Sequence, residues 1–147
     1  MATTVVIMVG LQGSGKSTLA KTLGMPIISS DALRLQHPEI KPTSTKIFSM
    51  MQKHLRICIE KGQDVVIDAV NVSKNERDRW ISIINKMKKQ GYEVRTWGIV
   101  MSTPIEVCLE RNANREAKVP PVAIHTTKKR FEKPTLEEGF DEIKMYP

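Results

Sequence analysis

The feature that most constrains this chain is a glycine-rich segment between an apolar run and a helix-forming stretch. Residues 10–17 read GLQGSGKS and fit the pattern G-x-x-x-x-G-K-[ST]. The apolar run VVIMV precedes the segment at 5–9, and STLAKTL continues it at 17–23. This order predicts a buried strand, a tight turn whose backbone N–H groups converge, and a helix. Such a turn cradles phosphate groups.

The residue types in this turn suit a nucleoside triphosphate. Gly10, Gly13 and Gly15 permit positive φ angles and let the backbone approach an anion closely. Lys16 offers a mobile charge to the β- and γ-phosphates, and the Ser17 hydroxyl can ligate Mg²⁺. A chance glycine-rich turn is the alternative. Because strand, motif and helix agree, we predict a protein that binds a nucleoside triphosphate.

Length and composition predict a single domain over residues 1–147 with an ordinary globular balance, 40% hydrophobic and 27% charged. The apolar run at 5–9 is too short for a signal peptide or a membrane span. Cys58 and Cys108 lie in apolar helical patterns and are predicted to be core residues in a reducing compartment. We therefore expect a cytoplasmic protein with no membrane partner.

The net charge of +7 is unevenly distributed. Residues 32–61 carry six basic side chains against two acidic ones, and residues 72–95 carry seven against three. A basic surface attracts polyanions. The lysines of the second segment are predicted to solvate the outer face of a helix. The first segment follows a strand that should flank the phosphate site, and it favours a polyanionic partner.

Apolar runs of strand length alternate with helical periodicity, which predicts an α/β fold with a parallel sheet. The predicted strands are Thr4–Val9, Pro26–Ser29, Asp64–Ala69, Glu93–Met101 and one near Phe140–Met145. The predicted helices are Lys16–Leu23, Ser44–Lys61, Lys74–Gln90, Thr103–Glu116 and a short one near Val122–Phe131. Right-handed crossovers bring the carboxyl ends of parallel strands to one edge of the sheet, where ligands bind.

Asp31 follows the second predicted strand, and Arg34 lies three residues on. If a helix begins at Asp31, both side chains lie near one face. A carboxylate there could accept a proton from an attacking hydroxyl, and an arginine could hold a phosphate. The alternative is that Asp31 only caps a helix, because the run Ser29-Ser30-Asp31 is rich in capping residues. The position at a strand end favours the catalytic role.

Asp68 closes the apolar strand VVID. In phosphate-loop proteins an acid in this position orients Mg²⁺ or its water shell. The alternative is a carboxylate that caps the turn toward Asn71 and Ser73. The phosphate-binding motif favours the metal role.

Arg111 and Arg115 are separated by one helical turn and precede Pro120-Pro121, which break a helix. A helix of this kind could act as a mobile lid that places a guanidinium on a transferring phosphoryl group. The alternative is an exposed helix in which Glu110 and Glu116 pair with the arginines.

Taken together, these motifs resemble the kinase domain of phage-type 5′-hydroxyl polynucleotide kinases. The likeness covers nearly the whole chain and rests on residues 10–18, 28–34, 65–71 and 131–135 together with the two lid arginines. It implies a P-loop kinase fold, a three-layer α/β sandwich in which helices flank a parallel sheet of about five strands, with a helical lid. The D-x-D-x-T signature of a fused phosphatase does not occur in the sequence, so 3′-phosphate removal is not expected.

The resemblance also implies the cofactors and the roles of individual residues. ATP would be bound by Gly10, Gly13, Ser14, Gly15, Lys16, Ser17 and Thr18, and Mg²⁺ by Ser17 and Asp68. Asp31 would be the general base that activates a nucleic-acid 5′-hydroxyl, and Arg34 would contact the phosphate on the acceptor's 3′ side. Arg115 would stabilise the transferring phosphates together with Lys16, and Arg111 would be the second lid arginine. The expected partner is a nucleic-acid 5′ end as substrate; homo-oligomers are common in such kinases, and a phage-encoded member would act in the host cytoplasm.

Three functions follow from these observations. The first is ATP-dependent transfer of the γ-phosphoryl group to the 5′-hydroxyl end of DNA or RNA, which the basic segment at 32–61 favours. The second is a small-molecule kinase that uses the same residues on a nucleoside, sugar or antibiotic hydroxyl. The third is a nucleotide-binding regulatory module, which has no need of Asp31, Asp68 or the lid arginines. With seven aromatic residues in the chain, we expect recognition of the nucleic-acid backbone rather than of its bases.

Overall fold

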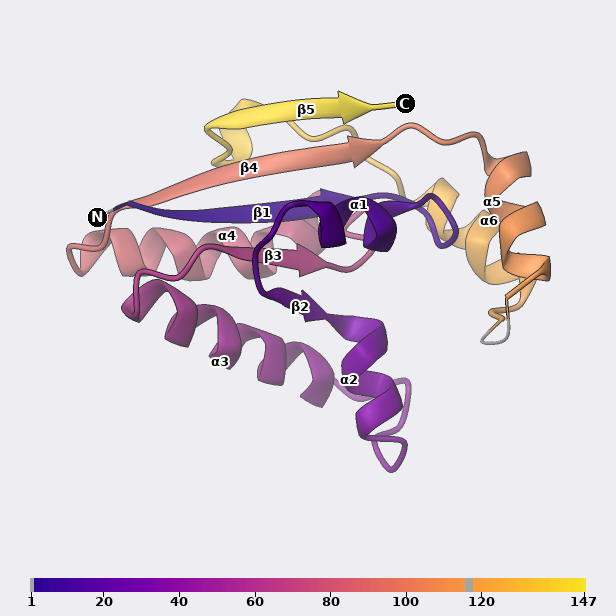
Figure 1. Ribbon diagram of the computed structural model, residues 1–147, viewed down its shortest axis with the longest axis horizontal. Coiled ribbons are helices and arrows are strands. Elements are labelled where there is room, and N and C mark those ends of the chain that lie inside the picture. Colours follow the sequence, from indigo (N-terminus) through magenta and orange to yellow (C-terminus); the bar gives the residue numbers. More distant parts are fainter. Residues whose placement is uncertain (1, 116–117) are drawn as a thin grey trace.

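The structure is a computed structural model that describes residues 2–115 and 118–147. A parallel sheet with the strand order β2-β3-β1-β4-β5 forms its centre (Figure 1). The strands are β1 Thr3–Val9, β2 Ile27–Ser29, β3 Val65–Asp68, β4 Val94–Met101 and β5 Glu142–Tyr146. The predicted parallel sheet is therefore confirmed, with each strand end within two residues of its predicted place.

The helices of the described residues are α1 Lys16–Thr22, α2 Ser30–Gln36, α3 Lys46–Glu60, α4 Lys74–Lys89, α5 Ile105–Ala113 and α6 Pro121–Lys129, with a 3₁₀ turn, η1, at Leu136–Glu138. The prediction that one helix extends to Glu116 is wrong, since α5 ends at Ala113; Glu116 itself lies outside the described residues. Asn112 explains the early end. Its buried amide donates to the Val119 carbonyl at 2.7 Å and accepts from the Val119 N–H at 3.1 Å, so the chain must turn back.

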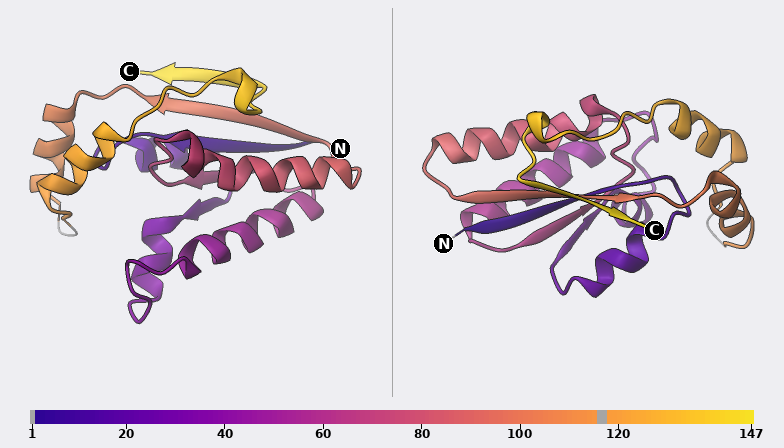
Figure 2. Two further views of the ribbon diagram at one scale, coloured as in Figure 1. Left: turned by 180° about the vertical axis from the view of Figure 1, so that it is seen from behind. Right: turned by 90° about the horizontal axis from the view of Figure 1, so that it is seen from above.

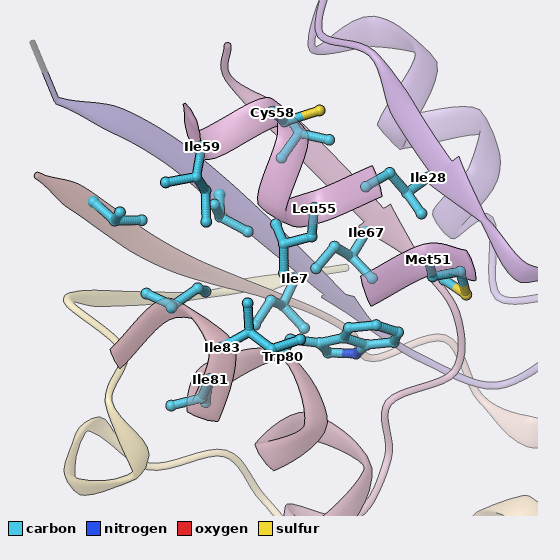
Figure 3. Packing of buried hydrophobic residues seen from close by; sticks show 14 of the residues in the cluster. Ile7, Ile28, Met51, Leu55, Cys58, Ile59, Ile67, Trp80, Ile81 and Ile83 are labelled. Atoms are coloured by element: carbon cyan, nitrogen blue, oxygen red, sulfur yellow. The ribbon is translucent and has the colours of Figure 1, made fainter. Parts of the chain in front are cut away.

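The three predicted layers arise because successive side chains of β1 point to opposite faces of the sheet. Val5, Ile7 and Val9 face a core that includes Met51 and Leu55 of α3 and Trp80 of α4. Val6 and Met8 face the opposite side and pack with Ala20 of α1. A strand covered on both faces needs apolar residues at every position, which accounts for the unbroken run in β1. The right-hand view of Figure 2 shows α3 and α4 on one side of the sheet, and Figure 3 shows the Trp80 indole among Ile7, Met51 and Leu55.

Helices α5 and α6 stand beside each other beyond the carboxyl ends of the strands, in the place of the predicted helical lid (Figures 1 and 2). The glycine-rich turn, the start of α2 and the turn after β3 meet at the same edge. This edge is therefore where a ligand site is expected. No helix among the described residues is both long and apolar enough to pass through a bilayer.

Candidate active site at the carboxyl edge of the sheet

The glycine-rich turn between β1 and α1 has the geometry of a phosphate cradle. Gly13 and Gly15 have φ angles of +81° and +93°. Gly10 does not have a positive φ angle, contrary to the prediction. A glycine suits this position for another reason, because a Cβ there would lie 2.7 Å from Ser14 Oγ. A Cβ on Gly13 would lie 2.7 Å from the Cys108 carbonyl oxygen of α5. The turn is thus packed directly against the lid.

Lys16, Ser17 and Asp68 form a compact group beside this turn. The Ser17 hydroxyl donates to Asp68 Oδ2 at 2.6 Å, and Lys16 Nζ lies 4.0 Å from Asp68 Oδ1. Asp68 is 6% exposed, and its Oδ1 has no hydrogen-bond partner in the described part of the chain. A buried carboxylate oxygen without a donor is costly unless a ligand satisfies it. A hydroxyl beside such a carboxylate fits the oxygen ligands that Mg²⁺ prefers.

The turn after β3 is held by Asn71, so the alternative that Asp68 caps this turn receives no support from the described contacts. Asn71 has a φ of 47°, and its amide donates to the Met8 carbonyl at 2.8 Å. Its side-chain oxygen accepts from the Trp80 indole N–H at 2.8 Å. The Val70 carbonyl in the same turn accepts from Gly10 N at 2.9 Å. These bonds fix Asp68 against the phosphate cradle and leave its carboxylate facing the site.

Asp31 lies in the first turn of α2. The cap of this helix is Ser29, whose hydroxyl accepts from the Ala32 N–H at 3.1 Å, so the alternative that Asp31 is the N-cap is wrong. The Asp31 carboxylate is exposed, and its Oδ1 lies 3.8 Å from Arg34 Nη1. The prediction that the two side chains lie near one face of a helix is confirmed.

Two cavities open at this edge, and among the described residues Lys16 and Asp31 line both. The first, about 550 Å³, is lined by residues 13–18 of the cradle together with Arg111, Arg115 and Tyr146. The second, about 640 Å³, is lined by Arg34, Phe48, Asp68, Arg79, Arg130 and other residues. A donor in one cavity and an acceptor in the other could therefore reach the same lysine and the same carboxylate.

The predicted lid arginines both line the first cavity. Arg111 Nη1 donates to the Gly13 carbonyl at 3.3 Å. The prediction that Arg111 and Arg115 lie one turn apart on the same helix is wrong, because Arg115 lies beyond the end of α5. In the described residues no ion pair joins Arg111 to Glu110, and the other suggested partner, Glu116, is outside them.

Sequence reasoning did not identify several residues of the site. Gln12 donates to Thr127 Oγ1 of α6 at 3.1 Å, and the Thr103 hydroxyl donates to the Ser14 carbonyl at 2.7 Å, so both tie the cradle to the lid segment. Phe48 and Arg79 line the second cavity from α3 and α4. Arg79 lies within the basic segment at 72–95, but no local spacing marks it as different from its neighbours.

A glycine-rich cradle between a central parallel strand and a helix, with an acid at the neighbouring strand end, defines a P-loop nucleotide-binding fold. The model of the family described as AAA domain (AAA_33) matches residues 5–134, and the chain belongs to this family. The chain is 29% identical over 148 residues to the bifunctional polynucleotide phosphatase/kinase of Schizosaccharomyces pombe. That match covers 97% of this chain and 33% of the relative, so the chain spans about a third of that protein.

Solved structures share the fold. A fungal RNA kinase superposes with a TM-score of 0.72 at 13% identity, over 100% of this chain and 75% of that one. The APS kinase CysC of Mycobacterium tuberculosis superposes with a TM-score of 0.66 at 15% identity, over 97% of this chain and 88% of that one. The resemblance to the P-loop polynucleotide kinases and the predicted fold are confirmed, and the findings together support a phosphotransferase.

Proposed function

We propose that this chain is an ATP- and Mg²⁺-dependent kinase that transfers the γ-phosphoryl group to the 5′-hydroxyl of a nucleic acid. The observation that carries the proposal is the pair of cavities meeting at Lys16 and Asp31. The phosphate cradle lines the first cavity and suits the donor. The second presents three arginines, Arg34, Arg79 and Arg130, and suits an acceptor that carries phosphate.

On the donor side, the backbone of residues 13–18 would hold the ATP phosphates, and the Lys16 ammonium would offset the charge of the β- and γ-phosphates. Ser17 and Asp68 would hold Mg²⁺, which neutralises phosphate charge when bound. Arg111 already lies against the cradle, and Arg115 lines the same cavity. Guanidinium groups placed there stabilise charge on the transferring group, an effect worth roughly 10³–10⁵ in rate when one acts as an arginine finger.

On the acceptor side, Asp31 accepts the proton of the attacking hydroxyl. Asp31 lines both cavities, and the contact of its carboxylate with Arg34 at 3.8 Å is too long to immobilise it. Since little covalent work is required of the protein in phosphoryl transfer, catalysis comes from positioning and charge stabilisation. Arg34, beside the base, would hold the phosphate on the acceptor's 3′ side.

A small-molecule hydroxyl kinase is the second candidate. A cavity of about 640 Å³ is within the size range of sites that enclose a single nucleotide or sugar. The fold neighbour that is an APS kinase shows that this architecture is compatible with a small acceptor. A single kinase domain over 1–147, a cytoplasmic location and homo-oligomer formation remain predictions from the sequence.

The test is transfer of labelled γ-phosphate from ATP to 5′-hydroxyl oligonucleotides, with DNA and RNA assayed in parallel. Oligonucleotides of the same sequence that already carry a 5′-phosphate are the matched control. Label on the 5′-hydroxyl form and none on the control is expected. Label confined to added nucleosides or sugars would favour the second candidate instead.

A further inference from the structure

Two guanidinium groups from different helices lie against one aromatic ring in the second cavity. Phe48 of α3 supplies the ring. The Arg79 guanidinium carbon, from α4, lies 3.8 Å from the ring centroid, and that of Arg34, from α2, lies 5.7 Å from it. All three side chains line the cavity that also contains Asp31. Contacts of this kind hold a cation over an aromatic face.

The charges of this cluster are only partly compensated within the described chain. Burial lowers the pKa of Arg79, the charge of Glu76 opposes this effect, and the charge of Arg34 adds to it. Glu76 is already engaged, since its Oε1 accepts from Arg130 Nε at 3.0 Å and its Oε2 from the Val72 N–H at 3.1 Å. Among the described residues, no carboxylate lies within 4.0 Å of the Arg79 guanidinium.

The Arg79 side chain is also held in place before any ligand arrives. The Phe48 ring supports it from one side, the Trp80 ring centroid lies 5.8 Å away, and Gln52 Nε2 donates to its backbone carbonyl at 3.2 Å. A planar guanidinium fork that is already oriented binds a phosphate through two parallel hydrogen bonds at a small entropic cost. A second cation nearby strengthens the attraction for an anion.

We propose that Arg79 and Arg34 form a two-armed clamp for a phosphate of the acceptor, with Phe48 as the platform that orients both arms. The inference rests on the proposed function and deepens it. Arg34 contacts Asp31, so one nucleotide can present its hydroxyl to Asp31 and its neighbouring phosphate to the clamp. Arg79 is therefore a specificity-determining residue: it selects acceptors that carry a phosphate beside the reacting nucleoside and disfavours free nucleosides.

The test compares kcat/KM for a nucleoside 3′-phosphate and for the same nucleoside in wild type, Arg79→Ala, Arg79→Lys and the exposed control Arg95→Ala. The Arg79→Ala variant is expected to reduce the ratio of the two values by about 10- to 100-fold, the range of a lost charge-assisted hydrogen bond. Arg79→Lys keeps the charge and loses the fork, so it should fall in between. The Arg95→Ala variant should leave the ratio unchanged.

A purely structural role for Arg79 would weaken both acceptors equally and leave the ratio unchanged, and that result would overturn the clamp. Equilibrium binding of the nucleoside 3′-phosphate and of the nucleoside is measured in parallel, because it does not depend on catalysis. If wild type transfers nothing to any 5′-hydroxyl but binds the 3′-phosphate form more tightly in an Arg79-dependent way, the proposed function fails and the clamp stands. Equal binding of both compounds by wild type overturns the clamp even if transfer occurs.

Discussion

A buried ion pair that lines neither of the two cavities is expected to control the stability of the site. Arg77 of α4 is fully buried; its Nε donates to Glu138 Oε1 at 2.7 Å and its Nη2 to Oε2 at 3.2 Å. Its Nη1 donates to the Asn71 carbonyl at 3.0 Å, in the turn that carries Asp68. Replacing Glu138 with Ala leaves the buried guanidinium without its counter-charge, and the Asp68 turn loses part of its support.

The expected cost follows from this burial. Removing one partner of a buried ion pair costs about 3–5 kcal/mol. For a domain of this size, 1 kcal/mol corresponds to roughly 2–4 °C in Tm, so Glu138→Ala should lower Tm by about 6–20 °C. The matched control is Glu142→Ala, which removes an exposed contact of 3.7 Å with Lys144. An exposed pair contributes up to about 1 kcal/mol, so the control should change Tm by no more than a few degrees.

Thermal and urea unfolding monitored by circular dichroism measure both variants, together with Arg77→Met and the double variant Arg77→Met/Glu138→Leu. Replacing a buried pair by apolar residues of similar volume is often close to neutral, so the double variant should be more stable than Glu138→Ala alone. A loss below about 1 kcal/mol in Glu138→Ala would refute the reasoning. A double variant whose loss equals the sum of the two single losses would also refute it, since the two side chains would then act independently.

The pH dependence gives a second readout of the same pair. Burial by itself raises the pKa of Glu138. Hydrogen bonds from Arg77 and Thr135 and the charge of Arg77 lower the pKa by more than burial raises it, so it lies below its ordinary value of 4.5. A carboxyl whose pKa is lower in the folded state stabilises the protein above its unfolded pKa, and this contribution is lost as the pH falls through the folded value. The Tm advantage of wild type over Glu138→Gln should be constant at neutral pH and shrink below about pH 4.5. An advantage that grows on acidification would contradict the assignment.

Five further substitutions, one of them a control, test the site itself. Lys16→Ala should lose both ATP binding and transfer. Asp31→Asn should keep ATP binding and transfer the phosphoryl group at least about 10²-fold more slowly, which is the contribution of a general base. Near-normal transfer by Asp31→Asn in single-turnover assays would mean that another residue is the base. Asp68→Asn should raise the Mg²⁺ concentration for half-maximal transfer by roughly tenfold or more in a metal titration, and an unchanged midpoint would remove Asp68 from the metal site. Gly13→Ala and Gly24→Ala both place a side chain at positive φ, +81° and +70°, for about 1–2 kcal/mol each. A Cβ at Gly13 meets the α5 backbone, whereas a Cβ at Gly24 meets open space. The Gly13→Ala variant should therefore be less stable than Gly24→Ala by about 1–3 kcal/mol. Equal Tm values for the two variants would show that the cradle is not packed against the lid.

The parts of the fold that bury apolar surface could be predicted from the sequence. The strands and the long helices α3 and α4 have clear periodicity because one or both faces pack into the core. Helix α2 lacks this signal, since Ser30 is its one buried residue and Leu35 is 76% exposed. The predicted end of α5 is wrong for another reason. Asn112 forms hydrogen bonds with the Val119 backbone, and no local sequence pattern predicts this contact.

The candidate site divides in the same way. Lys16 and Ser17 could be singled out because they belong to the glycine-rich motif. Asp31 and Asp68 could be singled out because each stands at or near the end of a predicted strand, and parallel topology brings those ends together. Phe48 and Arg79 could not, because they lie inside α3 and α4 and reach the second cavity only after these helices have packed on the sheet. Their separation along the sequence therefore does not predict that the two side chains line the same cavity.

This division bears on how acceptor choice arises in such a chain. The first cavity, proposed for the donor, has one contiguous segment, residues 13–19, as the largest part of its lining, so a short motif sets much of its chemistry. The second cavity, proposed for the acceptor, takes much of its lining from α2, α3, α4 and α6, so single substitutions on these helices can change its charge without disturbing the cradle. The two cavities share Lys16 and Asp31, so under the proposed function the same base and the same lysine would serve whatever hydroxyl the second cavity admits. We therefore infer that acceptor identity is decided by residues such as Arg34 and Arg79, and that assays which vary the acceptor will separate related kinases where assays of ATP binding will not.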